Sequence, residues 1–353
     1  MPYPTAPLST SRVANGKIVT SPGESTSVCK SAGVETPVEL NPAQQEVLAQ
    51  LGAPRDERPQ FDAVLRHELR RSLEDKLGPL IGLLDARADA KPGDNMFVSK
   101  HKLARVMGCE RQFVTEEADP FQWSVPIARG SVAHKAIELS VHWRREPEPL
   151  VLVDESIARL SEGIDGMADW LQEISEVERA ELRGDVNDMV VKFLECFPPL
   201  KSAWYPSTET GLRVEIHDRF ILSGKVDLAL GRADGGRAGK VLIDLKTGKF
   251  SPSHRDDLRF YALLEAIRVG TPPRRLASYY LSEGRFVPED VTEDLLFSTV
   301  DRVCDAVERI LMLSTGQRDP ATATGPACRW CIAKADCDDG QRYLADDEDD
   351  PVW

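Results

Sequence analysis

The sequence predicts an α/β fold in which a central mixed β-sheet is flanked by helices. Three observations lead to this prediction. Apolar residues recur at helical spacing through much of the first two hundred residues, apolar and polar residues alternate from about residue 211, and a further helix and strand follow these alternating segments. Helices followed by a group of strands and then by another helix and strand are typical of an α/β or α+β domain.

The first 98 residues are expected to form two segments. Residues 1–40 are rich in Ser, Thr, Pro and Gly and lack apolar periodicity, which favours a disordered tail. Residues 41–98 are expected to be an N-terminal helical segment. Asn41 is a preferred helix start and Gly52 is a preferred helix end. The helices of this segment are expected at residues 41–52 and 61–85.

A compact domain is expected over residues 99–343. Its first part should contain helices, and its second part should contain a β-meander, a further strand, a helix, an edge strand and a long helix. The helices are expected near residues 99–108, 130–145, 153–174, 176–196, 255–268 and 290–314. The strands are expected within residues 211–230, 239–249 and 276–283. Residues 344–353 are expected to be a solvated acidic tail.

The composition favours a soluble, cytoplasmic protein. Of the 353 residues 41% are hydrophobic, which is enough for a sizeable core, and neither a membrane span nor a charged-then-apolar leader is evident. The net charge of −14 argues against a surface coated by nucleic acid or anionic membrane, although a local basic channel is compatible with it. Seven cysteines do not suit a secreted disulfide framework, so reduced thiols, some of them metal ligands, are expected.

The predicted strand GKVLIDLKTGK carries two opposite charges. Because side chains alternate between the faces of a strand, Asp244 and Lys246 should share one face, while Ile243 and Leu245 point into the core. An exposed ion pair of this spacing is common and contributes little to stability. The motif alone therefore does not indicate a function.

Asp227 and His134 change this interpretation. Asp227, in the segment SGKVDLAL, lies on the neighbouring predicted strand, and two carboxylates on adjacent strands can converge on a hard divalent cation. Without a cation between them their repulsion would be costly. His134 follows Gly130 in a G-x-x-x-H pattern near the start of an amphipathic helix. The remaining histidines are expected to be ordinary surface or core residues: His67, His101, His142, His217 and His254.

The order G-x-x-x-H, G-x-x-D, D-x-K resembles the RecB-like branch of the PD-(D/E)xK nuclease superfamily. The resemblance implies a restriction-endonuclease-like core and a metal-dependent deoxyribonuclease. Mg²⁺ or Mn²⁺ would be held by His134, Asp227, Asp244 and the carbonyl of Leu245. Lys246 would act on the attacking water and the developing charge. Hydrolysis of a phosphodiester needs a metal, an oriented water and a stabilised leaving oxygen, and these groups can supply them.

The family usually carries a Q-x-x-x-Y motif on the helix after the D-x-K strand. In this chain that helix reads HRDDLRFYALLEAI, so Tyr261 matches as a further site residue and Asp257 stands at the Gln position. A carboxylate is favoured near a helix N-terminus, so a helix cap is the preferred interpretation of Asp257, with orientation of water or a second metal as the alternative. Tyr261 also lies three residues after Leu258, which is compatible with a core position.

Three cysteines lie close together near the C-terminus. Cys328, Cys331 and Cys337 follow a C-x2-C-x5-C spacing, which is typical of a metal cluster or of zinc. They need a fourth ligand. Cys29 falls in the expected tail, and Cys196 and Cys304 look like core residues, which leaves Cys109.

RecB-like nucleases with an iron–sulfur staple are similar in this respect, with one Cys before the His motif and three beyond the nuclease core. The AddB nuclease domain and the CRISPR-associated RecB-like exonucleases are examples. The resemblance implies a [4Fe–4S] cluster that joins the two ends of the domain, with zinc as the alternative. Its ligands would be Cys109, Cys328, Cys331 and Cys337.

The expected function is a nuclease, most simply an exonuclease, acting on single-stranded DNA or DNA ends in repair, recombination or defence. A protein partner such as a helicase is compatible with it, and no membrane is expected. A noncatalytic DNA-end-binding or assembly subunit that keeps the nuclease fold is the main alternative. A zinc-binding interaction module, with the D-x-K pair as a mere salt bridge, is a third interpretation.

Overall fold

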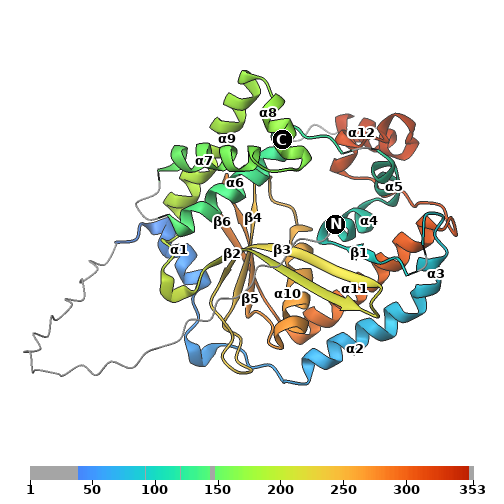
Figure 1. The fold of residues 1–353 in the computed structure, drawn as a ribbon, viewed down its shortest axis with the longest axis horizontal. Coiled ribbons are helices and arrows are strands. Elements are labelled where there is room, and N and C mark those ends of the chain that lie inside the picture. The colour runs from blue at the N-terminus through green and yellow to red at the C-terminus, as the bar shows by residue number, and fades with distance from the viewer. Residues whose placement is uncertain (1–38, 92, 120, 144–147, 350–353) are drawn as a thin grey trace, which may run out of the picture. The chain divides into compact units, whose positions relative to one another are not determined.

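The computed structural model describes residues 39–349 apart from residues 92, 120 and 144–147, and there a six-stranded mixed sheet is flanked by helices (Figure 1). The central strand β3 is covered along one edge by the antiparallel strand β2, while its other edge is shared by the parallel strand β1 at one end and the antiparallel strand β4 at the other. β5 pairs parallel with β4, and β6 pairs antiparallel with β5. The strands are β1 (Met96–Val98), β2 (Ser207–Ile216), β3 (Phe220–Leu230), β4 (Val241–Lys246), β5 (Arg275–Tyr280) and β6 (Arg285–Asp290).

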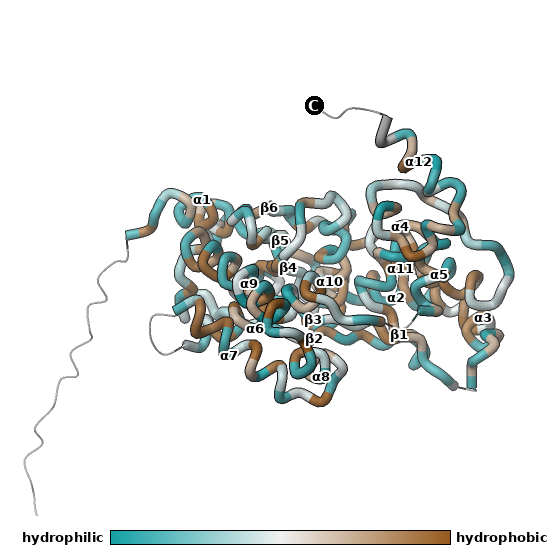
Figure 2. The backbone as a smooth tube through the Cα atoms, turned by 90° about the horizontal axis from the view of Figure 1, so that it is seen from above, coloured by the Kyte–Doolittle hydropathy of each residue, from teal (hydrophilic) through white to brown (hydrophobic). Residues whose placement is uncertain are grey.

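Helices pack against both faces of this sheet, as Figure 2 also shows from above. One core is formed with α2, α4, α10 and α11, and the other with α1, α6, α7, α8 and α9. The helices are α1 (Pro42–Leu51), α2 (Leu65–Leu77), α3 (Ile81–Asp85), α4 (Lys100–Gly108), α5 (Glu110–Ala118), α6 (Val125–His142), α7 (Pro149–Ser161), α8 (Gly166–Glu173), α9 (Glu176–Cys196), α10 (His254–Val269), α11 (Glu293–Ser314) and α12 (Asp338–Asp349). Short 3-10 helices are Arg55–Glu57, Gly78–Leu80, Ser202–Trp204, Pro326–Trp330 and Lys334–Asp336.

The predicted α/β class, with its mixed sheet and N-terminal helices, is confirmed. Local sequence explains the first helix well, because the Asn41 side chain accepts the backbone N–H of Gln44 while the Gln44 side chain accepts that of Asn41. Among the helices between residues 39 and 349, none combines the length and apolar character that crossing a membrane requires. The expected tail at residues 1–40 falls almost entirely outside the described residues.

Several element predictions are wrong. The expected edge strand at residues 276–283 is β5, which lies between two partners, and the edge strand is β6, where Pro288 is tolerated. The single helix expected at 153–174 is two helices, because the chain turns near Gly163 and Asp165 caps a new helix start. β1 and α5 were not predicted, and α12 occupies the first part of the expected acidic tail, of which residues 350–353 lie outside the described residues.

Strand β4 is buried on both faces, which differs from the expectation that its two charges occupy a face free of core. Ile243 and Leu245 point into the core with α6 and α9, as expected. Leu242, however, lies on the face of Asp244 and belongs to the core with α10 and α11. Asp244 is only 1% exposed. A strand covered by helices on both sides leaves no solvated face for a charge, so this carboxylate needs specific partners.

Candidate active site and cysteine site

The candidate site lies where one edge of β3 loses its strand partners. β1 pairs with β3 as far as Leu222, and β4 pairs with it only from Leu228 onward. Asp227 stands at the end of this gap, and its carboxylate accepts the backbone N–H of Leu245 at 2.7 Å. This hydrogen bond satisfies a donor of β4 at the point where the two strands diverge. The gap therefore brings the G-x-x-D and D-x-K motifs side by side.

His134 reaches the same gap from α6. Its Nε2 lies 2.8 Å from the carbonyl oxygen of Leu245, and its Nδ1 lies 3.5 Å from a carboxylate oxygen of Asp227. Since a carbonyl can only accept, Nε2 donates, and in a neutral ring the lone pair of Nδ1 then faces Asp227. Nitrogen and oxygen lone pairs that face one another suit a cation between them.

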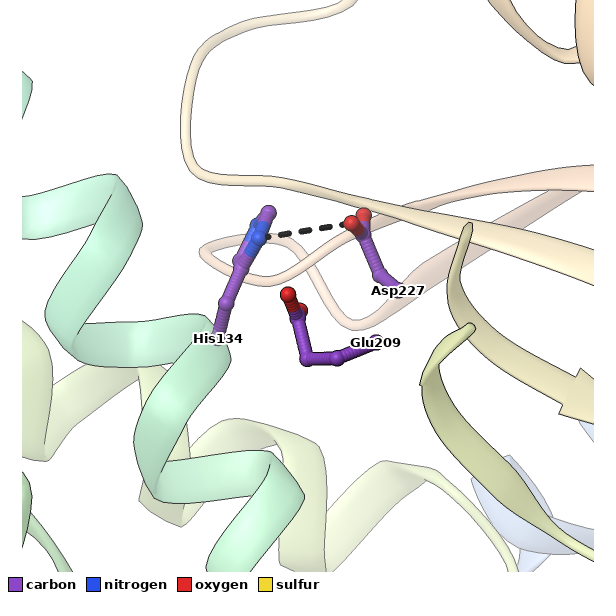
Figure 3. A group of neighbouring side chains, drawn as sticks. All are labelled: His134, Glu209 and Asp227. Carbon is purple, nitrogen blue, oxygen red and sulfur yellow. Dashed lines mark ion pairs between the residues drawn. The ribbon is translucent and has the colours of Figure 1, made fainter. Parts of the chain in front are cut away.

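Glu209 on β2 completes this group and was missed by the sequence analysis. The β2–β3 register places it opposite Asp227, but its φ of 48° takes it out of the ladder between the pairs Thr208–Leu228 and Thr210–Val226. A left-handed non-Gly residue inside a strand is strained, and such strain is concentrated at functional sites. The donor atoms of His134, Glu209 and Asp227 all lie within 4.8 Å of one another, and Figure 3 shows the three side chains converging.

Asp244 is held between two lysines. One carboxylate oxygen accepts a hydrogen bond from Lys100 Nζ at 2.6 Å. The other forms an ion pair with Lys246 Nζ at 2.6 Å, but the angles of this contact are not those of a hydrogen bond. Burial alone would raise the pKa of Asp244, but the two ammonium groups lower it below its usual value. By contrast, burial and the neighbouring carboxylate of Asp244 raise the pKa of Asp227. The carboxylate of Asp244 thus stays charged in the core and already faces positive charge at both oxygens, as a ligand of a cation would.

Lys246 bridges two carboxylates. Its ammonium lies 2.7 Å from Asp257 on α10 as well as against Asp244. Asp257 lies in the first turn of α10, where a carboxylate is expected, but it makes no side-chain cap hydrogen bond and accepts one from Lys246 instead. Burial would lower the pKa of Lys246, yet Asp244 and Asp257 raise it overall. Lys246 is therefore a fixed cation in this site.

Tyr261 lies in the core and at the site at once. It is 2% exposed, and burial raises the pKa of its hydroxyl to about 12. The Lys100 ammonium lies 5.0 Å from the centre of its ring. The ring packs directly over Gly224, where an added Cβ would lie 2.5 Å from its Cε1 atom. The glycine of the G-x-x-D motif thus leaves room for the tyrosine of the last motif.

The donors in the gap fit a hard divalent ion. Carboxylates, a carbonyl and an imidazole are ligands that Mg²⁺ and Mn²⁺ accept. The structure brings together all five residues predicted for this site and adds Glu209 and Lys100. The predicted residues are His134, Asp227, Asp244, Lys246 and Tyr261, beside the carbonyl of Leu245.

The four predicted cysteine ligands line one cavity of about 380 Å³. Backbone N–H groups of Ala323 and Gly340 donate to the thiols of Cys109 and Cys337 at 3.5 and 3.4 Å. Among the described residues no three of these sulfurs lie within 4.8 Å of one another, whereas thiolates around one zinc ion at about 2.3 Å would be about 3.8 Å apart. Cys304 is buried in the core, and Cys29 lies outside the described residues.

A group of hydrogen bonds, the Glu110 clamp, joins the start of α5 to residues 318–321 next to this cavity. Glu110, which follows Cys109, accepts two hydrogen bonds from Arg318 at 2.5 Å and one from the backbone N–H of Ala321 at 2.9 Å. These bonds lower the pKa of Glu110 to about 2. Arg309 adds a longer contact at 3.3 Å. Residues 318–321 are therefore fixed beside α5 independently of any group in the cavity.

Comparison with known proteins gives one family match. The family model of the PD-(D/E)XK nuclease superfamily matches residues 98–338. Among solved structures, a candidate exonuclease from Eubacterium rectale is similar at 11% identity and a TM-score of 0.41, with 71% of this chain and 88% of that chain covered. The protein SSO0001 is similar at 13% identity and a TM-score of 0.33, with 76% and 95% covered. No curated protein matches the chain.

Proposed function

This chain belongs to the PD-(D/E)XK nuclease superfamily, and on that basis we propose that it is a metal-dependent deoxyribonuclease of the RecB-like branch. Its substrate would be single-stranded DNA or a DNA end, and its mode that of an exonuclease. The observation that carries the proposal is the convergence of the donor atoms of His134, Glu209 and Asp227 beside the buried carboxylate of Asp244.

Each residue of the gap has a distinct task in this proposal. A divalent ion would be held by Asp227, Asp244, Glu209, His134 and the carbonyl of Leu245, and it would neutralise phosphate oxygens and lower the pKa of a bound water. Lys246 would stabilise negative charge on the phosphate, because Asp244 and Asp257 keep its ammonium in place. Asp227 also fixes the backbone of β4 through the N–H of Leu245.

We further propose a [4Fe–4S] cluster on Cys109, Cys328, Cys331 and Cys337. The volume of the cavity, and the absence of three of these sulfurs within 4.8 Å of one another in the described residues, favour a cluster over a single zinc ion. The cluster would be structural and would contribute folding free energy. The RecB-like order of motifs supports a cytoplasmic role in DNA repair, recombination or defence, with a helicase as the kind of protein partner expected.

A noncatalytic DNA-end-binding subunit is the second candidate. It is favoured by Lys100, which occupies one oxygen of Asp244, and by Asp257, which stands where the family usually has Gln. In this alternative the ammonium of Lys100 takes the place of the ion, and the site keeps its fold without turnover.

Incubation of the full chain, purified anaerobically, with labelled single- and double-stranded DNA tests the proposal. The nuclease proposal expects cleavage with Mg²⁺ or Mn²⁺ but not with EDTA, and a loss of about 100-fold or more in Asp244→Asn. Asp188→Asn, which changes an exposed acid on α9 in the same way, is the matched control. Intact DNA in every sample, with retention of DNA ends by the wild type, would instead support the noncatalytic subunit.

Metal analysis of the same preparation tests the cluster. The [4Fe–4S] proposal expects a brown protein with about four iron atoms per chain. The variant Cys331→Ser should lose both the colour and the iron. A colourless protein that contains zinc and no iron, even under anaerobic handling, would refute it.

A further inference from the structure

A second cavity, with a volume of about 680 Å³, lies away from the four-cysteine cavity. It lies between the end of α1, the Trp204–Tyr205 turn before β2, and the Gly-rich turn that joins β3 to β4. Leu230 and Val241, at the paired ends of these strands, form part of its wall. This volume falls within the range of pockets that bind small organic ligands.

Arginines dominate the charge of this cavity, although the chain as a whole carries a net charge of −14. Arg55 is neutralised by an ion pair with Asp234. In the described part of the chain, by contrast, Arg58, Arg232 and Arg274 have no carboxylate partner within 4.0 Å: Arg58 donates to a backbone carbonyl, and Arg232 lies 4.1 Å above the ring of Tyr205. Three guanidinium groups around one cavity thus lack a carboxylate partner, although acidic residues outnumber basic ones in this chain.

Of the three arginines, Arg274 gives the strongest indication of an anion site. It is 7% exposed, and its buried Nε has no hydrogen-bond partner. One of its terminal nitrogens donates to the carbonyl of Leu51 at the C-terminal end of α1, which explains part of its position. Burial, with Arg275 and Arg58 nearby, lowers the pKa of Arg274 to about 10. A buried guanidinium among like charges is costly unless an anion compensates it.

The aromatic side chains of the cavity suggest what the anion is attached to. Trp204 is half-buried and Tyr205 is 51% exposed, so aromatic surface is available beside the arginines. Tyr205 adopts a left-handed conformation with φ of 49°, which is strained for a tyrosine. Arginines bind phosphate through paired N–H groups, and aromatic rings stack on nucleobases.

We propose that this cavity binds a nucleoside phosphate, with the phosphate on Arg58, Arg232 and Arg274 and the base against Trp204 or Tyr205. Two sources share this chemistry: a free nucleotide, and a nucleotide within a DNA strand. The second source rests on the proposed function. Leu230 lies three residues along β3 from Asp227, a rise of about 10 Å, so the cavity is close enough for the same strand to reach it from the candidate metal site.

The test uses the double variant Arg58→Gln/Arg232→Gln of the full chain. Arg274 is left intact because its bond to α1 has a structural role. Arg71→Gln, an exposed arginine on α2 with the same charge change, is the control. Two probes are titrated in EDTA: thymidine 5′-monophosphate by calorimetry, and a fluorescent 5′-phosphorylated oligothymidylate by anisotropy at several salt concentrations.

The double variant is expected to bind at least one of the two probes roughly tenfold or more weakly than the wild type and Arg71→Gln do. For the oligonucleotide, losing the contact to this one phosphate should also reduce the slope of log K against log salt by about 0.7. An effect confined to the monophosphate identifies a free-nucleotide site, and one confined to the oligonucleotide identifies a strand-binding site.

Equal affinities of the double variant and the control for both probes would overturn the proposal, and so would a wild type that binds neither probe. Because EDTA removes divalent ions, this result is independent of cleavage. A protein that binds through these arginines but never cleaves DNA would refute the nuclease proposal and leave the cavity proposal standing.

Discussion

Replacing Gly224 by alanine gives the most direct test of the candidate site's geometry. The added methyl group would lie 2.5 Å from Tyr261 Cε1 and 3.1 Å from its hydroxyl oxygen. Ordinary contact begins at 3.4 Å, so the ring must move by about 0.9 Å (3.4 minus 2.5). Tyr261 is buried and lies against Lys100, so this displacement would also disturb the Lys100–Asp244 pair.

We expect Gly224→Ala to destabilise the fold by about 1–3 kcal/mol, the usual cost of an extra buried methyl group in a packed core. For a domain of this size the loss corresponds to a fall in Tm of roughly 2–10 °C. Thermal unfolding followed by circular dichroism under anaerobic conditions measures it. DNA cleavage, if present, should fall more than stability alone explains, because the site is displaced as well.

Two second-site variants decide whether Tyr261 causes the effect. Tyr261→Phe keeps the Cε1 atom, so Gly224→Ala should be as costly in that background as in the wild type. Tyr261→Leu removes the ring edge, so the added cost of Gly224→Ala should shrink to a few tenths of a kcal/mol. An equal cost in the wild type and in the Tyr261→Leu background would refute the packing argument.

Three further outcomes are expected. Lys100→Met removes the ammonium group that competes with a metal ion for the carboxylate of Asp244. Because the site becomes more negative, Mn²⁺ should bind about tenfold or more tightly in an electron paramagnetic resonance titration. Weaker Mn²⁺ binding would mean that Lys100 supports the site instead. Asp227→Asn should raise stability at pH 8 by about 1–3 kcal/mol while weakening Mn²⁺ binding. The pKa of Asp227 is raised on folding, so ionisation penalises the folded state above about pH 4, and the gain should vanish at pH 4 in urea unfolding; a gain that does not depend on pH would contradict this cause. Glu110→Gln should cost about 1.5–3 kcal/mol at pH 7 through its lost charge on Arg318. Because the pKa of Glu110 is lowered to about 2, that stabilisation is present above about pH 4.5 and lost as the pH falls towards 2, and a deficit that persists at pH 2 would disprove the assignment.

Long periodic elements could be predicted from the sequence, but the sheet order could not. The helix expected at 255–268 is observed at His254–Val269, because a run of apolar residues and a Gly stop are local features. β1 has only three residues and pairs with a strand more than 120 positions later, so no local pattern marks it. The error over β5 has the same origin, because whether a strand is central or at the edge depends on distant partners.

The candidate site divides in a similar way. Asp227, Asp244 and His134 could be identified because each belongs to a motif of residue types in a fixed order. Lys100 could not, since its partner Asp244 is 144 residues away and a lysine at a helix start ordinarily faces solvent. Glu209 was missed because the predicted meander began after it, and only the register with β3 places it opposite Asp227.

The Glu110 clamp has a consequence for how this protein would respond to oxidative damage. Two adjacent residues, Cys109 and Glu110, contact the same C-terminal region: the Cys109 thiol accepts the backbone N–H of Ala323, and the Glu110 carboxylate accepts hydrogen bonds from Arg318. Oxidants attack iron–sulfur clusters and thiolates but leave a carboxylate–guanidinium pair intact. If the cysteines hold a cluster as proposed, its loss would still leave residues 318–321 fixed beside α5. A damaged molecule would then keep one side of the cysteine site ordered, so a new cluster could be built into the existing chain.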